Sequence, residues 1–143
     1  DPVTGERRVA VDLAVPRFGQ PMPGVGLIVR LDLLGRDNVP AFPELERRLP
    51  IGLTPALVRE TIRIRLPEGY AVEEMPKAVQ LQTPYGTYSS AYEFAERTVV
   101  VQRTLRLEDR TVPVAEYAAL RKFLGDVAKA DRSSLVLRQP PAQ

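Results

Sequence analysis

The side chains of this chain that could do chemistry are carboxylates, hydroxyls and arginines, because it contains no cysteine and no histidine. Without a thiol or an imidazole, it lacks a thiolate nucleophile, the base of a Ser-His-Asp arrangement and the commonest metal ligand. Neighbouring carboxylates occur at Glu73-Glu74 and Glu108-Asp109. Acid–base catalysis needs a defined separation and one pKa raised by burial, whereas these pairs look like solvated turn residues. We therefore predict no catalytic, cofactor-binding or metal-binding residue, and no cofactor.

Two charged residues interrupt apolar patterns. Glu60 falls among the apolar positions of one alternating stretch, and Arg103 falls among those of another. An unpaired buried charge costs roughly several kcal/mol, so each needs a partner or a path to water. We predict that Glu60 and Arg103 form a buried ion pair across neighbouring strands or across a sandwich. The alternative is that both lie near a sheet rim and reach water.

Tyrosines cluster around two Pro-x-Gly sequences, at Pro67 to Gly69 and Pro84 to Gly86. Such rings usually fill a core and direct the hydroxyl to its rim, although they can also form a sugar or peptide platform. Tyr85 occupies the third position of its turn, which normally points outward. The predicted interaction surface consists of Tyr85, Tyr88, Arg63 and Arg65.

The elements that must position these residues are mainly strands. Apolar and polar side chains alternate with period two, as in a strand with one buried face, and one-sided burial favours antiparallel sheets. The longest alternating stretches are Arg7–Val15, Val25–Leu33, Val58–Leu66 and Thr98–Leu107. Shorter strands are predicted at Val79–Leu81, Thr87–Phe94 and Ser134–Arg138, with an edge strand near Arg48–Leu53 and loops at Gly19–Gly24 and Gly35–Pro43.

One segment, Val114–Asp131, changes to helical spacing. Pro113 suits the first turn of a helix, and Gly125 inside it costs about 1 kcal/mol relative to alanine. The stripe that we expect to pack on the sheet comprises Tyr117, Leu120, Phe123, Leu124 and Val127. The predicted fold class is thus mainly β: a single antiparallel β-sandwich domain over residues 1–143, with one C-terminal amphipathic α-helix packed on the sheet.

Composition narrows the classes of function. The 143 residues are 44% hydrophobic and 27% charged, as in a globular domain, and the net charge is only +2. The nearest approach to a basic patch is Arg59, Arg63 and Arg65, so we predict no nucleic-acid partner. No apolar run is long enough to span a bilayer, and we predict no direct membrane insertion. Because the chain lacks an initiating methionine and a signal-like start, we expect a piece of a larger protein.

Several segments together carry a family resemblance. In order they are Ile62 to Tyr70, Val72 to Pro76, Tyr85 to Tyr88, the strand Val99 to Leu107, Glu116-Tyr117 with Phe123, Ala130 to Arg132, and Leu135 to Leu137. Their order and spacing resemble the C-terminal β-rich domain of bacterial transglutaminase-like proteins, over roughly Leu49 to Arg138. Those proteins join an N-terminal domain of unknown function, a transglutaminase-like core and this C-terminal domain.

The resemblance implies that the chain lies beside a catalytic domain, and it implies no activity for the chain itself. In that family the Cys-His-Asp catalytic residues belong to the core, and this chain has no Cys or His to receive them. The implied role is a non-catalytic structural or interaction domain, not an enzyme, whose partner is an upstream transglutaminase-like domain of the same polypeptide. A carbohydrate- or peptide-binding module that positions a protein or glycan substrate is the alternative. The resemblance also suggests a periplasmic or exported parent.

Overall fold

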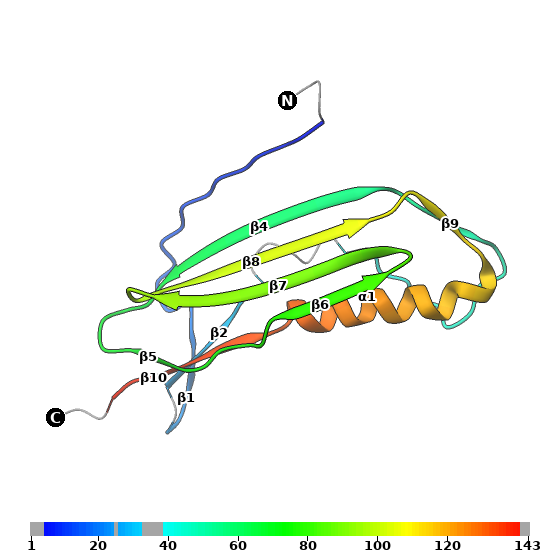
Figure 1. The fold of residues 1–143 in the computed structure, drawn as a ribbon. Coiled ribbons are helices and arrows are strands. Elements are labelled where there is room, and N and C mark those ends of the chain that lie inside the picture. Colours follow the sequence, from blue (N-terminus) through cyan, green and yellow to red (C-terminus); the bar gives the residue numbers. More distant parts are fainter. Residues whose placement is uncertain (1–4, 25, 33–38, 141–143) are drawn as a thin grey trace.

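The computed structural model describes residues 5–24, 26–32 and 39–140. Its largest element is a four-stranded antiparallel sheet, here called the large sheet (Figure 1). In spatial order its strands are β4 (Ala56–Arg65), β8 (Thr98–Leu107), β7 (Gly86–Ala95) and β6 (Val79–Thr83). The alternation in the sequence is therefore expressed as an antiparallel sheet with two distinct faces, as predicted.

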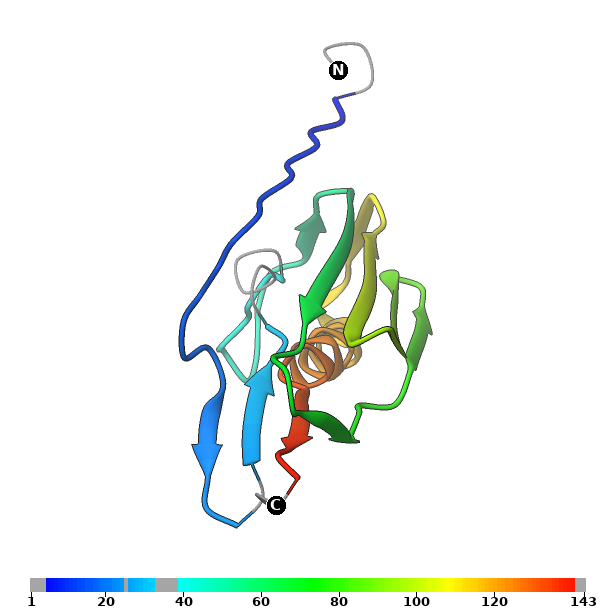
Figure 2. The same cartoon turned by 90° about the vertical axis from the view of Figure 1, so that its left-hand side faces the viewer.

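A second layer covers one face of the large sheet, here called the inner face. Half of it is a small antiparallel sheet in the order β1 (Gln20–Met22), β2 (Gly26–Arg30), β10 (Ser134–Arg138) and β5 (Ala71–Glu74). The other half is helix α1 (Tyr117–Asp131), preceded by a 3-10 turn, η1 (Val114–Glu116). A two-stranded pair of β3 (Ile51–Leu53) and β9 (Arg110–Val112) continues the fold at one end, as Figures 1 and 2 show. The mainly β fold with a single C-terminal helix among the described residues is confirmed.

The core accordingly has two parts. Where α1 covers the large sheet, the helical stripe packs against β3, β7, β8 and β9, and we call this the helix-side core. Where the small sheet covers it, β2 and β10 pack against β4 and β8, and we call this the strand-side core. The helix-side core includes Tyr88, Leu105, Leu107, Leu120, Phe123 and Val127. The strand-side core includes Val29, Leu31, Val99, Val101, Leu135 and Leu137.

Strand β8 runs under both parts of the core. Its inward residues alternate as period two requires, with Val99 and Val101 in the strand-side core and Leu105 and Leu107 in the helix-side core. The inward position between them is Arg103, which is only 7% exposed. A charged residue thus lies at the junction of the two apolar clusters, where α1 ends and β10 begins.

Tight hairpins join the strands of the large sheet. Pro84 and Tyr85 connect β6 to β7, and Thr83 pairs with Gly86. Between β7 and β8, Glu96 and Arg97 both have positive φ, at 50° and 62°. Two successive left-handed residues are the signature of a type I′ turn, whose twist matches that of the flanking strands.

Some predicted elements are wrong. The stretch Arg7–Val15 is exposed and forms no strand. An alternating pattern lets a segment become a strand, but the segment must also find a neighbouring strand to pair with. The predicted loop Gly19–Gly24 contains β1, and the predicted turn carboxylates Glu73 and Glu74 lie in β5. The edge strand near Arg48–Leu53 is confirmed in shorter form as β3. Val25, Leu33 and residues 35–38 of the predicted loop lie outside the described residues.

Candidate functional site

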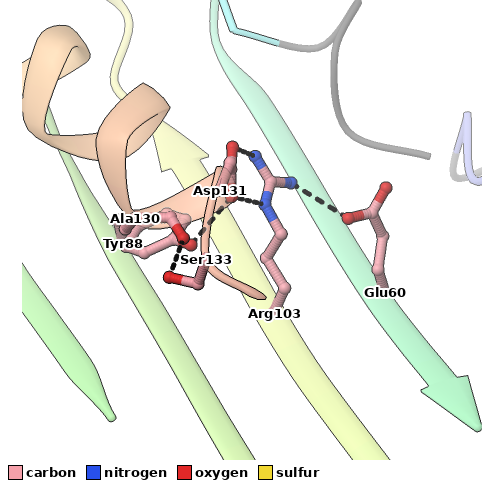
Figure 3. A network of polar contacts seen from close by, with 6 residues as sticks. All are labelled: Glu60, Tyr88, Arg103, Ala130, Asp131 and Ser133. Atoms are coloured by element: carbon pink, nitrogen blue, oxygen red, sulfur yellow. Dashed lines mark hydrogen bonds and ion pairs between the residues drawn. The ribbon is translucent and has the colours of Figure 1, made fainter. Parts of the chain in front are cut away.

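The principal cluster of polar side chains surrounds Arg103 on the inner face of β8 (Figure 3). Its Nε and Nη2 donate to the two carboxylate oxygens of Asp131, both at 2.6 Å. Its Nη1 donates to Glu60 Oε2 at 3.1 Å, and the side chains of Glu60 and Asp131 are 12% and 13% exposed. This bidentate geometry is the strongest form of an arginine–carboxylate interaction. We call Arg103, Asp131, Glu60 and Tyr88 the Arg103 network.

Tyr88 completes the network from β7. Its hydroxyl donates to Asp131 Oδ1 at 2.8 Å, and the guanidinium carbon of Arg103 lies 5.5 Å from the centre of its ring. Burial, and then the hydrogen bond and negative charge of Asp131, raise the pKa of the Tyr88 phenol; the Ser90 hydroxyl and the Arg103 charge oppose the rise without cancelling it. Tyr88 is therefore a neutral donor at ordinary pH.

The charge of Arg103 is stabilised by its partners. Burial alone would lower the pKa of the guanidinium, because it disfavours the charged form. The hydrogen bonds and charge of Asp131, followed by the charge of Glu60, outweigh burial and hold the pKa of Arg103 above its usual value. The network is thus permanently ionised at its centre, which suits a fixed structural contact and not a proton carrier.

The end of α1 positions Asp131. The helix closes with Arg132 N–H donating to the carbonyl of Lys129 at 3.2 Å, and Ser133 N–H donating to that of Ala130 at 3.1 Å. The Ser133 hydroxyl also donates to the Ala130 carbonyl, at 2.7 Å. These bonds satisfy carbonyls that a helix end leaves open, and they fix the last turn directly above Arg103. Leu31 N–H donates to the Ser133 carbonyl at 3.3 Å, which connects this turn to the chain just after β2.

Beside the network lies a cavity of about 20 Å³, bordered by Glu60, Ser90, Arg103 and Asp131 among others. Ser90 is 3% exposed. Its Oγ is buried near the Tyr88 phenol and has no hydrogen-bond partner among the described residues. A space of this size and polarity holds about one water molecule. Small-molecule sites are larger, at about 300–1,000 Å³.

A second cluster of the same residue types lies at the other end of α1. The Tyr85 hydroxyl donates to Glu116 Oε2 at 3.1 Å, and Arg110 Nη2 donates to the same oxygen at 3.0 Å. The guanidinium carbon of Arg110 lies 5.5 Å from the centre of the Tyr85 ring. Burial, followed by the bond to Glu116, raises the pKa of Tyr85. We call Tyr85, Arg110 and Glu116 the Arg110 cluster.

The structure brings together some of the predicted site residues and separates others. Glu60 and Arg103 are paired directly opposite one another on β4 and β8, and their side chains are in contact. The predicted interaction surface is wrong for Tyr85 and Tyr88, which are 4% and 2% exposed. The hairpin that carries Tyr85 is covered by Arg110 and Glu116, while Tyr88 faces the end of α1. Arg63 and Arg65 are exposed at the opposite end of the large sheet.

Sequence reasoning missed the main partner of Arg103. Asp131 lies four residues beyond Val127 and continues the spacing of Tyr117, Leu120 and Leu124. Its position on the apolar stripe was the signal that the carboxylate would face the sheet. In the described part of the chain, no group of three or more Asp, Glu, His or Cys could hold a metal ion, and no helix is long and apolar enough to cross a membrane.

The described residues also border a larger groove on the outside of α1. Its volume is about 570 Å³, and Phe42, Arg121, Gly125 and Arg132 contribute to its walls. A Cβ added at Gly125 would meet nothing within 4 Å. Arg121 Nε donates to the Phe42 carbonyl at 3.2 Å, which attaches one wall to the helix. The volume lies in the range of small-molecule and peptide sites.

Comparisons with known proteins identify relatives of the fold. Residues 37–137 match the model of a family described as a domain of unknown function with a solved structure, DUF3858. A crystal structure of a "putative protease" from Parabacteroides distasonis superposes with a TM-score of 0.63 at 19% identity, over 78% of this chain. The match spans only 23% of that protein's chain, and at this identity it establishes the fold alone. No curated protein matches the chain.

Proposed function

Since the chain belongs to the DUF3858 family, whose function is unknown, we propose that it is a non-catalytic accessory domain of a longer polypeptide. Its partner is a transglutaminase-like core in that polypeptide, against which it packs. The observation that carries the proposal is the Arg103 network, in which the ionised groups of the inner face bond to one another around a space of about 20 Å³. Groups engaged in this way stabilise a fold and leave no room for a substrate.

The context of the related structure supports the same role. A fold that accounts for 23% of a larger protein described as a "putative protease" leaves most of that protein for other parts. The sequence of this chain also resembles the C-terminal domain of transglutaminase-like proteins, in which the reactive Cys and His belong to a separate core. Both observations favour an appendage to an enzyme.

The outer face of the large sheet is the surface that we assign to this packing. The described α1 and small sheet lie on the inner face (Figure 1). The outer face carries half-buried Thr98, Val100 and Thr104 beside exposed Arg63. Small and β-branched side chains flanked by arginine form a flat surface, as a domain contact of moderate polarity requires.

Two measurements test the proposal. The purified chain should neither hydrolyse a protein substrate nor incorporate an amine into one, whereas deleting residues 37–137 from the longer polypeptide should lower the melting temperature of its catalytic part. Val100→Asp, on the outer face, should weaken the packing, and Gln80→Asp, near the far edge of the same face, is the matched control. Turnover by the purified chain that disappears in a folded Asp131→Asn variant would refute the non-catalytic role.

A second candidate is a carbohydrate- or peptide-binding module, favoured by the groove of about 570 Å³ beside α1. Its arginines would suit a ligand that bears a carboxylate. The Cβ of Gly125→Leu would meet no atom within 4 Å, and the variant should abolish chemical-shift changes caused by an acidic peptide or a uronic-acid oligosaccharide. If neither probe causes shifts in the unaltered chain, this candidate fails.

A further inference from the structure

Residues 7–15, here called the N-terminal segment, have the pattern of a strand but no strand neighbour among the described residues. Four large apolar side chains lie on one face of the segment with high exposure: Val9 84%, Val11 58%, Leu13 76% and Val15 51%. An exposed apolar row of this kind is unusual on a soluble monomer and marks a contact surface. The segment is therefore competent to add to a sheet elsewhere.

The large sheet offers an open edge of matching length. Strand β4 has ten residues, and among the described residues it is hydrogen-bonded to β8 alone, as the first strand of its sheet. Its inner face carries half-buried Ile62 and Ile64, and its outer face carries exposed Arg59, Arg63 and Arg65. A long strand edge with unpaired peptide groups is a template for a further strand.

The side chains of the two elements are complementary in one antiparallel register. Placing Asp12 opposite Arg63 also places Leu13 opposite Ile62 and Val11 opposite Ile64. The apolar row of the segment then continues the inner face of β4, and its acidic residue meets the arginines of the outer face. Opposite-charge and aliphatic cross-strand pairs both stabilise a sheet.

Chain direction decides which molecule supplies the strand. In Figure 1 the N-terminal segment runs in the same direction as β4, and in both views it lies on the β4 side of the large sheet. Residues 16–19 lead directly into β1, so within one molecule the segment could pair with β4 only in parallel. The large sheet is antiparallel throughout, and antiparallel pairing is the more stable form.

We propose that residues 9–15 of one molecule add antiparallel to β4 of a second copy, and that the reciprocal exchange forms a twofold dimer. The same surface is used by both subunits, as a closed twofold interface requires. Each subunit would thereby cover the exposed apolar row and the open strand edge of its partner. This self-association goes beyond the proposed accessory role, which uses the outer face of the sheet.

The absence of cysteine from the chain permits a direct cross-linking test. In the proposed register Ala10 lies opposite Arg65, both on the outer face, so the double variant Ala10→Cys with Arg65→Cys should form a disulfide-linked dimer on a non-reducing gel. The matched control, Ala10→Cys with Gln82→Cys on the distant strand β6, should not. A disulfide within a single chain, or the absence of any disulfide, would overturn the proposal.

Charge exchange tests the register by a separate readout. Arg63→Asp should raise the dimer dissociation constant in sedimentation equilibrium by about tenfold, since one cross-strand pair is lost at each of two sites. Adding Asp12→Arg to that variant should restore the affinity. Circular dichroism distinguishes dissociation from unfolding, because both positions are outside the two parts of the core. Monomeric unaltered protein at millimolar concentration would refute the exchange.

Discussion

Each end of α1 is attached to the rest of the fold by an arginine, a tyrosine and a carboxylate, but the two clusters differ in burial. In each cluster an arginine lies 5.5 Å from a tyrosine ring, and the tyrosine hydroxyl donates to a carboxylate at a helix end. At the C-terminal end the arginine side chain, Arg103, is 7% exposed, whereas at the N-terminal end that of Arg110 is 37% exposed.

The difference in exposure shows that burial, and not the kinds of side chain present, decides how much such a cluster contributes to the stability of the fold. Water can replace the partners of Arg110, so its contacts contribute little net stability. The side chains of Asp131 and Glu60 are only 13% and 12% exposed, so removing Arg103 would leave their charges without a compensating cation. The Arg103 network therefore fixes how α1 and β10 meet the large sheet, and the Arg110 cluster only reinforces the other end.

The largest effect should follow from Arg103→Ala. The variant leaves the carboxylates of Asp131 and Glu60 buried near one another without a cation, and it should lower the free energy of unfolding by about 3–5 kcal/mol. Urea denaturation followed by circular dichroism measures this loss. The volume-conserving variant Arg103→Met with Glu60→Gln and Asp131→Asn removes all three charges and should recover most of it. If Arg103→Ala lowered the free energy of unfolding by less than about 1 kcal/mol, the Arg103 network would contribute no more stability than an exposed cluster, and the contrast would be wrong.

The next effect concerns alkaline pH. The folded state raises the pKa of Tyr88 above the ordinary tyrosine value of 10.0, so the proton is held more tightly in the folded than in the unfolded chain. Stability is therefore complete below pH about 10 and declines as the pH rises further, by up to about 1.4 kcal/mol per pH unit. Urea titrations from pH 8 to 11.5 measure the slope.

Tyr88→Phe supplies the control for this slope. It removes the titrating group and the hydrogen bond to Asp131, so it should cost about 1.5–3 kcal/mol at neutral pH and flatten the alkaline decline. Tyr85→Phe, in the Arg110 cluster, should flatten it less, because the shared carboxylate there is more exposed. If both variants reduced the alkaline loss of stability equally, the two clusters would not differ in the way that their burial indicates.

Between the two clusters, Gly125→Ala should stabilise the helix. Gly125 lies inside α1, and the added Cβ would meet no atom within 4 Å. The gain should be about 0.5–1 kcal/mol, from helix propensity alone, seen as a higher urea midpoint. The increment should be the same in the Arg110→Ala background, since neither cluster touches this position.

The smallest effect should come from Arg110→Ala. Its bond to Glu116 joins side chains that are 37% and 38% exposed, so the loss should be about 0.2–1 kcal/mol and should shrink in 0.5 M salt. Thermal denaturation at low and high salt measures both quantities. A salt-independent loss as large as that of Arg103→Ala would show that exposure does not rank the clusters.

The sequence predicted the large sheet well because period-two alternation is a local property of each strand. It predicted the stripe of α1 for the same reason. It could not predict the fate of residues 7–15, since a strand needs a neighbour that alternation does not specify. The burial of Tyr85 was also beyond it, because the residues that cover the hairpin, Arg110 and Glu116, come from a distant part of the chain. The inward position of Asp131 could have been predicted, because Asp131 shares the helical spacing of Leu120, Leu124 and Val127.

The position of β10 determines when the small sheet can be completed during synthesis of the chain. This strand lies between β2 and β5 in the small sheet, yet it is the last of the described strands to leave the ribosome. Until residues 134–138 emerge, β5 has no neighbour in that sheet, and Val99 and Val101 are not yet covered by Leu135 and Leu137. Biosynthesis thus leaves one half of the interior uncovered until residues 134–138 have been made, while the meander of β6, β7 and β8 can already pair.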